Sequence, residues 1–307
     1  MDSHNGSPLA KNLQGLSLVI IATLCWSTSG IFINLITDAT QVSAVGLAFW
    51  RDLCTFLILL VGISLLHPPY LKVKRQDLPW LIAMGGISIG LFHVLWNTSV
   101  VLIGASLATV VQSNAPIFVT IMAWFLFDEP LTTKKIIAVC LAVLGTILIA
   151  GVQSTGNIQV SPSGLLIALG SAIFYGTLSL FGKKLSGDYH SWTILLYIFG
   201  FGSLILLPFQ FNRSLPNPIN LQVLLLFLGF LLISTIIGFG LYTRGLEKLQ
   251  ASVASITATT EILFASLLAY VILGERMGSW QILGSVFIIS GVVLVTIQNN
   301  QKRKKGG

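Results

Sequence analysis

The sequence has very few charged residues. Asp, Glu, Lys and Arg make up only 9% of its 307 residues, whereas soluble domains carry about 25%. Hydrophobic residues make up 54% of the chain, and the mean hydropathy is +0.89. These values exclude a soluble globular protein and predict an all-α integral membrane protein.

The sequence also lacks the signatures of several enzyme classes. It contains no GxxxxGK[ST] motif, which excludes a built-in nucleotide-driven motor, and no HExxH motif, which would indicate a zinc-dependent protease. The three cysteines, Cys25, Cys54 and Cys140, lie in apolar stretches without CxxC or Cys/His spacing. We therefore expect no disulfide, no metal and no cofactor.

Apolar runs follow one another along almost the whole chain. A bilayer core about 30 Å thick is crossed by roughly 20 apolar residues in a helix. The runs predict ten spans, which leave no room for a soluble domain: 13–36, 42–66, 78–101, 104–127, 133–151, 163–184, 191–211, 219–243, 249–273 and 278–298.

The basic residues lie mostly in alternate loops between these spans, so the net charge of +7 points away from nucleic acid as a partner. Basic loops face the cytoplasm, which predicts that both termini are cytoplasmic. We expect a multi-pass protein of the cell membrane, in the inner membrane of a bacterium, with the lipid bilayer as a partner. Arg213 and Arg276 lie in loops that are predicted to face the outer side of the membrane. The residues predicted to be inside are Lys11, Lys72, Lys74, Arg75, Lys134, Lys135, Lys183, Lys184, Arg244, Lys248, Lys302, Arg303, Lys304 and Lys305.

One stretch of the chain occurs twice. Residues 105–131 and 251–277 both begin with Ala-Ser, and each has a Glu close to its end, Glu129 in the first copy and Glu275 in the second. Because five helices are an odd number, two five-helix copies enter the membrane in opposite directions, as in transporters with inverted repeats. The expected organisation is a repeat at 13–151, an outside linker at 152–162, a repeat at 163–298 and a basic cytoplasmic tail at 299–307. A chance match between apolar helices is the alternative.

Glu261 is an acid at the centre of span nine. An acid at this depth costs about 2.5 to 3.5 kcal/mol on insertion scales, and such residues usually face a cavity or a partner. Glu261 is therefore predicted to bind a substrate ammonium or to accept a coupling proton. Thr257, one turn earlier, lies on the same helix face and could orient it. A structural glutamate bonded to a neighbouring helix is the alternative.

Span three carries His93 and, one turn later, Trp96. A histidine in this position can take up a proton or bind substrate, and a packing role for it is equally open. Asn97, Gln112 and Asn114 add amides to spans three and four. These amides either line a substrate cavity or hold helices together.

Arg51 and Asp52 form an adjacent pair in span two. Neighbouring residues on a helix point about 100° apart, so the two are not expected to face one partner. Arg51 is predicted to act as a gate or as a tether between helices, with Asp52 neutralising it locally. An ion pair between Arg51 and Glu261 is a further possibility.

Trp26, Trp96, Tyr175 and Tyr242 occupy paired positions in the two copies. Amphipathic aromatics usually lie at membrane interfaces, whereas these lie within their spans. As a set they predict an aromatic cavity wall suited to flat or apolar organic substrates, although helix packing explains each one singly.

The order of these motifs resembles a known family. Ten short spans in two copies, Phe49-Trp50-Arg51 in span two, Pro116 in span four, and LFDEPL and ILGERM after spans four and nine resemble the EamA-type transporters of the drug/metabolite transporter superfamily. The resemblance implies a substrate cavity lined by spans one, three, four, six, eight and nine. Many relatives have Glu-Pro in span nine, whereas Ile262 follows Glu261 here. We therefore expect Pro116 to bend one helix and Glu261 to bind in the other.

The predicted function is secondary transport by alternating access, either proton-coupled or facilitative. The substrate would be a small organic metabolite, such as an amino acid, an aromatic metabolite or an amphipathic compound. With one deep acid and few deep cations, the chain is poorly suited to multiply phosphorylated substrates. A membrane enzyme acting on lipid and a passive channel are the alternatives.

Overall fold

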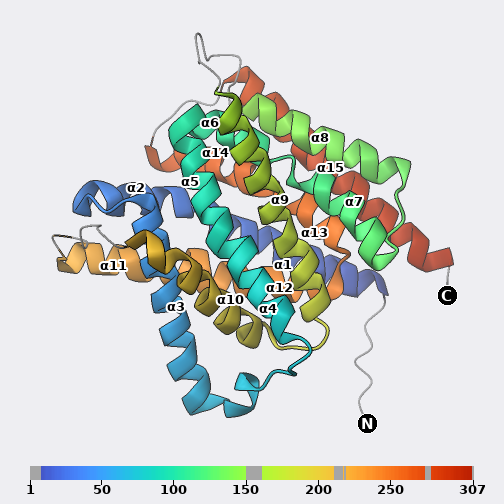
Figure 1. Ribbon diagram of the computed structural model, residues 1–307. Helices are drawn as coiled ribbons and strands as arrows, with labels where there is room; N and C mark the ends of the chain where they lie inside the picture. The colour runs from blue at the N-terminus through green and yellow to red at the C-terminus, as the bar shows by residue number, and fades with distance from the viewer. Residues whose placement is uncertain (1–7, 150–160, 211–216, 218, 274–277, 306–307) are drawn as a thin grey trace.

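A computed structural model describes residues 8–149, 161–210, 217, 219–273 and 278–305 (Figure 1). All the regular structure in these residues is helical. Glu275, Arg213, Arg276 and nearly all of the predicted linker lie outside the described residues. The predicted tail continues as helix to Lys305.

Each predicted span corresponds to one helix or to consecutive helical segments. The elements are α1 (Pro8–Ser27), α2 (Ser29–Thr40), α3 (Ala44–Leu66), η1 (Pro68–Leu71), α4 (Leu78–Gly85), η2 (Gly86–Leu91), α5 (Phe92–Ile103), α6 (Ala105–Gln112), α7 (Ala115–Phe127), α8 (Thr133–Ile149), α9 (Pro162–Leu185), α10 (Ser191–Leu206), η4 (Leu207–Gln210), α11 (Leu221–Gly229), η5 (Phe230–Ile237), α12 (Gly238–Lys248), α13 (Ala251–Ala258), α14 (Thr260–Leu273) and α15 (Ser279–Lys305).

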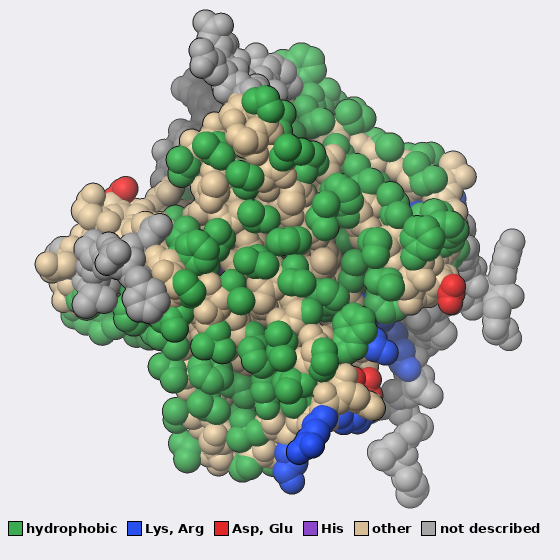
Figure 2. All heavy atoms as spheres, viewed as in Figure 1, with side chains coloured by type: hydrophobic (Ala, Val, Ile, Leu, Met, Phe, Trp, Pro, Cys, Tyr) green, Lys and Arg blue, Asp and Glu red, His purple; other side chains and the backbone are tan. Residues whose placement is uncertain are grey.

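In the described part of the chain, nine helical segments are long and apolar enough to cross a bilayer. The predicted span 133–151 corresponds to α8, whose 17 residues reach about 25 Å at 1.5 Å per residue. The first span is longer than predicted, since the membrane-spanning segment formed by α1 and α2 covers residues 10–40. Apolar side chains cover most of the face seen in Figure 2. Such a surface suits lipid rather than water, so the chain is a multi-pass helical membrane protein.

Spans four and nine are interrupted at matching positions of the repeat. α6 gives way to α7 at Ser113 and Asn114, and α13 gives way to α14 at Thr259. The expectation that only the helix with Pro116 would bend is therefore wrong, because both helices break. In span nine the hydroxyl of Thr259 donates to the Ile256 carbonyl at 2.7 Å, and that of Thr260 to the Thr257 carbonyl at 2.8 Å. Such side-chain bonds compete with the helical ladder, so the break needs no proline.

Spans three and eight, another matching pair, each contain a π-helical segment, η2 and η5. Such segments in helices are frequent at functional sites. In span three, η2 is followed directly by Phe92 and His93 of α5. The irregular segments of spans three, four, eight and nine thus lie in helices that the family resemblance places around the cavity.

Small residues let the last helices of the two copies approach closely. α8 and α15 pack side by side along much of their length (Figure 1). A Cβ built on Gly145 would lie 2.6 Å from the Gly284 carbonyl oxygen, and one built on Gly284 would lie 2.5 Å from that of Gly145. The two backbones therefore touch, as is usual for small residues between membrane helices.

Replacing Gly145 with Ala should destabilise the protein by about 1 to 3 kcal/mol, because the added methyl forces α8 and α15 apart. Gly62→Ala in α3 is the matched control, since nothing lies within 4 Å of a Cβ at that position. Thermal unfolding of both variants in detergent measures the difference. Equal unfolding midpoints would show that the Gly145 contact does not determine the packing.

Candidate functional site

A cavity of about 610 Å³ lies among the helices that carry the predicted site residues. Its walls come from α1, α2, α3, α5, α6, α7, α13 and α14, with single residues of α8, α9, η5, α12 and α15. Both copies of the repeat contribute. The volume falls within the range of about 300 to 1,000 Å³ that is usual for small-molecule sites.

The cavity is displaced toward one end of the helix bundle. The other end, called the basic end here, carries the loops that follow α3, α7, α9 and α12. Hydrogen bonds join these loops and the helix ends beside them: Lys74 to Asp188 at 3.3 Å, Lys183 to the Leu246 carbonyl at 2.8 Å, and the Ala251 amide to Glu129 at 2.7 Å. Blue side chains mark this end at the lower right of Figure 2. On α3, which ends there, the lining residues are confined to 44–51.

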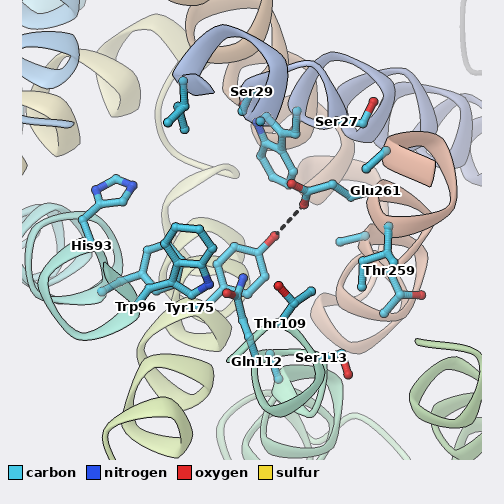
Figure 3. A pocket seen from close by; sticks show the side chains of 18 of the residues that line it. Ser27, Ser29, His93, Trp96, Thr109, Gln112, Ser113, Tyr175, Thr259 and Glu261 are labelled. Carbon is cyan, nitrogen blue, oxygen red and sulfur yellow. Dashed lines mark hydrogen bonds between the residues drawn. The ribbon is translucent and has the colours of Figure 1, made fainter. Parts of the chain in front are cut away.

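Glu261 lies on the cavity wall in the first turn of α14 (Figure 3). Its side chain is half-buried, and the Tyr175 hydroxyl of α9 donates a 3.4 Å hydrogen bond to its carboxylate. The partial positive charge at a helix N-terminus favours a carboxylate in this position. The break at Thr259 thus gives Glu261 a favourable helix end beside the cavity.

A second polar cluster, made of Arg51, Asp52 and His93, borders the cavity on α3 and α5. The Arg51 guanidinium donates to Asp52 Oδ1 from Nε at 3.0 Å and from Nη2 at 2.9 Å. Arg51 Nη2 also lies 2.9 Å from His93 Nε2. The same Arg51 nitrogen lies 3.4 Å from His93 Nδ1, and because a guanidinium can only donate, the imidazole is the acceptor in this contact. His93 Nδ1 faces Asp52 Oδ2 at 3.9 Å, and Oδ2 has no hydrogen-bond partner among the described residues.

The expectation that Arg51 and Asp52 would not share a partner was wrong, because both face His93. The Arg51 side chain is long enough for its guanidinium to reach Asp52, so a 100° difference in direction does not separate the two charges. Asp52 is fully buried and was predicted only as a local neutraliser. Arg51 forms its ion pair with Asp52 rather than with Glu261.

Aromatic side chains form much of the remaining wall. Trp26, Trp96 and Tyr175 line the cavity as predicted residues, joined by Phe92 and Phe239. The Phe92 and Tyr175 rings lie 5.2 Å apart, and the Trp26 and Phe239 rings 4.9 Å apart. Nothing in their spacing distinguished these phenylalanines from the other apolar residues of their spans.

The other predicted residues divide between the wall and the packing behind it. Asn97 and Gln112 line the cavity. Tyr242 lies outside the lining, with its ring 4.8 Å from that of Trp26 and its hydroxyl 2.7 Å from Ser179. The Asn114 amide donates to the Val110 and Val111 carbonyls at the break in span four.

Thr257 is also outside the lining, and its hydroxyl donates to the Val253 carbonyl at 2.8 Å rather than to Glu261. The break at Thr259 separates it from Glu261. Hydroxyl and amide side chains that the sequence left unmarked complete the wall, namely Ser27, Ser29, Thr109, Ser113, Ser255, Thr259, Ser266 and Gln281. Among the described residues, no group of three His, Cys, Asp or Glu side chains could hold a metal ion.

This arrangement, a polar and aromatic cavity among interrupted membrane helices from two copies of a repeat, is that of a membrane transporter. The model of the EamA-like transporter family matches the chain twice, over residues 13–151 and 162–297. The chain belongs to the EamA-like transporter family, and the two matches are consistent with duplicated halves. The predictions of this family and of transport rather than enzymatic activity are confirmed.

Similar proteins include an uncharacterized transporter of Archaeoglobus fulgidus, 30% identical over 73% of this chain and 79% of the relative. The uncharacterized inner membrane transporter YicL of Salmonella typhimurium is 26% identical over 96% of this chain and 99% of its own. A probable amino-acid metabolite efflux pump of Salmonella typhimurium is 24% identical, covering 77% and 84%. A solved crystal structure with a TM-score of 0.79 and 16% identity covers 94% of this chain and 98% of its own, which shows the same fold.

Asp52→Ala should destabilise the protein by about 3 to 5 kcal/mol, because it leaves the buried Arg51 guanidinium without its carboxylate. The control is Asp188→Ala, which breaks a pair whose side chains are 58% and 53% exposed and should leave stability nearly unchanged. Thermal unfolding in detergent compares the two. An unfolding midpoint of Asp52→Ala close to that of the parent protein would contradict a structural role for the ion pair.

Proposed function

We propose that this protein is a secondary transporter that carries a small organic metabolite by alternating access, with Glu261 as the group that binds the substrate ammonium or the coupling proton. The observation that carries the proposal is the placement of Glu261. Its carboxylate lies on the wall of a cavity shared by both halves, with the Tyr175 hydroxyl at 3.4 Å as its hydrogen-bond partner. One weak neutral donor leaves much of the carboxylate's bonding capacity available to a cation.

The rest of the wall supports a substrate with an apolar body. The rings of Trp96, Phe92 and Tyr175 present flat surfaces beside the acid, and such rings attract cationic groups over their faces. On another part of the wall, the Arg51 guanidinium has more N–H donors than Asp52 and His93 use, and it offers a site for an acceptor group of the substrate. An amino acid, an aromatic metabolite or an amphipathic amine matches this pattern. The name of one relative, a probable amino-acid metabolite efflux pump, agrees with it.

The membrane sidedness proposed here has both termini in the cytoplasm, with the basic end facing inward. It rests on the positive loops, among them those with Lys72, Lys134 and Lys183. The relative named as an inner membrane transporter supports placement in the inner membrane of a bacterium. The cavity is then displaced toward the outer side, and the two copies of the repeat run in opposite directions.

A thermal-shift screen of the purified protein against metabolite classes identifies a ligand. A ligand present at about 100 times its dissociation constant stabilises the protein by about 2.7 kcal/mol. Amines and zwitterions with an apolar body should raise the unfolding midpoint, and polyphosphates should not. Stabilisation by polyphosphates alone would contradict the proposed substrate class.

Glu261→Gln should fold normally and lose transport of the ligand found in this way, because the amide keeps the shape of the side chain and removes its charge. Flux in reconstituted liposomes and the thermal shift by ligand are the two measurements. Glu247→Gln, at an exposed position of α12, is the matched control and should transport as the parent protein does. Parental flux in Glu261→Gln would refute the role of this carboxylate.

A further inference from the structure

The basic end of the bundle is tightly closed in this conformation. All eight residues of α13 are buried, and Leu249, which precedes it, is 1% exposed. A Cβ built on Gly15 would lie 2.8 Å from Leu249, and one built on Gly245 would lie 2.6 Å from Val19. α1, α12 and the start of α13 therefore pack together without space for a substrate to pass. Access from this side requires these segments to separate.

Glu129 lies in this closed end and joins the two halves of the chain. It follows α7 in the first half and is 5% exposed. Its carboxylate accepts a hydrogen bond from the Ala251 amide at 2.7 Å, one from the Ser252 amide at 3.4 Å and one from the Ser252 hydroxyl. Lys135 Nζ, also buried, lies 3.1 Å from the same carboxylate. One carboxylate thus binds the first turn of α13 in the second half and a lysine in its own half.

The sequence of the repeat contains both parts of this contact. Each copy begins its long segment with Ala-Ser and has a Glu close to its end. In the structure, the Glu near the end of the first copy caps the Ala-Ser that begins the second. The turn that aims Glu129 starts at Asp128, whose φ of 52° places it in the left-handed region that ends α7.

The contact is suited to controlling the position of α13. Hydrogen bonds to a carboxylate are stronger than neutral ones, and the amides of a helix N-terminus favour a negative charge. By contrast, the Lys74–Asp188 pair, which also joins the halves at this end, is exposed and screened by solvent. α13 in turn carries Ser255 and Ala258 to the cavity wall. Movement of α13 away from Glu129 would therefore open the closed end and, at the same time, change the wall of the cavity.

We infer that Glu129 is a positioning residue for transport, which holds α13 and keeps the basic end closed in this conformation. The cavity becomes accessible from the basic side when Ala251 and Ser252 leave the Glu129 carboxylate. This inference rests on the alternating access proposed above and is independent of the substrate.

The test measures access to the cavity from each side. In a variant whose cysteines 25, 54 and 140 are replaced by alanine, Ser255→Cys places one thiol on the cavity wall. A membrane-impermeant maleimide is then applied to right-side-out and to inside-out vesicles. Lys74→Cys in the same background, at a side chain 58% exposed, shows which vesicles present the basic end.

Adding Glu129→Gln should make labelling of the thiol at position 255 from the basic side about tenfold faster, the effect of losing one charged hydrogen bond that favours the closed state. Labelling from the opposite side should stay the same or fall. Ser252→Ala, which removes only one donor to Glu129, should change the two labelling rates in the same direction by a smaller factor. The control Glu247→Gln should change neither labelling rate.

Unchanged labelling from the basic side in both Glu129→Gln and Ser252→Ala would overturn the inference. Labelling raised equally from both sides would also overturn it, because it would mean that the carboxylate only supports the fold. If the transport proposal alone fails, Glu129→Gln still changes labelling of the thiol from the basic side, while no ligand crosses the membrane of the liposomes.

Discussion

The bilayer provides no water to the polar groups of the spans, so each of these groups must find its partner inside the protein. This constraint explains most of what distinguishes the structure from a plain helix bundle. The hydroxyl of Thr23 pairs with that of Thr260 at 2.8 Å, and Ser88 with Thr177 at 2.6 Å, each joining one half of the chain to the other. Glu261 has one long hydrogen bond, from Tyr175, so its carboxylate is only partly hydrogen-bonded within the protein, and it lies beside the cavity.

Three acidic groups illustrate different solutions to the same constraint. Asp52 is fully buried and is paired with Arg51 through two hydrogen bonds. Glu129 is bound by helix amides, a hydroxyl and Lys135 at the closed end. Glu261 alone among these has a single neutral partner and a cavity in front of it. The difference in partners, rather than the presence of an acid, separates structural carboxylates from the one proposed to bind substrate.

Much of this organisation could be predicted from the sequence. Apolar length indicated the spans, and the paired motifs indicated the duplication, because both depend on composition and order along one chain. Glu261, His93 and the aromatics Trp26, Trp96 and Tyr175 were predicted to face a cavity and do so.

Contacts between helices that are distant in the chain could not be predicted from the sequence. The contact that Asp52 and Arg51 share with His93, and the capping of α13 by Glu129, depend on which neighbours the packing provides. The same holds for Phe92 and Phe239, which look like any other apolar residues until the cavity is seen. Tyr242 was expected in the wall with Trp26, yet lies one layer behind it, against the Trp26 ring.

Counterflow in liposomes tests the central claim most directly. Vesicles are loaded with an unlabelled ligand from the thermal-shift screen, and labelled ligand is added outside at low concentration. A carrier whose single cavity faces the two sides in turn predicts saturable uptake, with the labelled ligand rising transiently above its equilibrium level. Uptake that rises in proportion to concentration without this overshoot would instead show a passive pore and contradict the account.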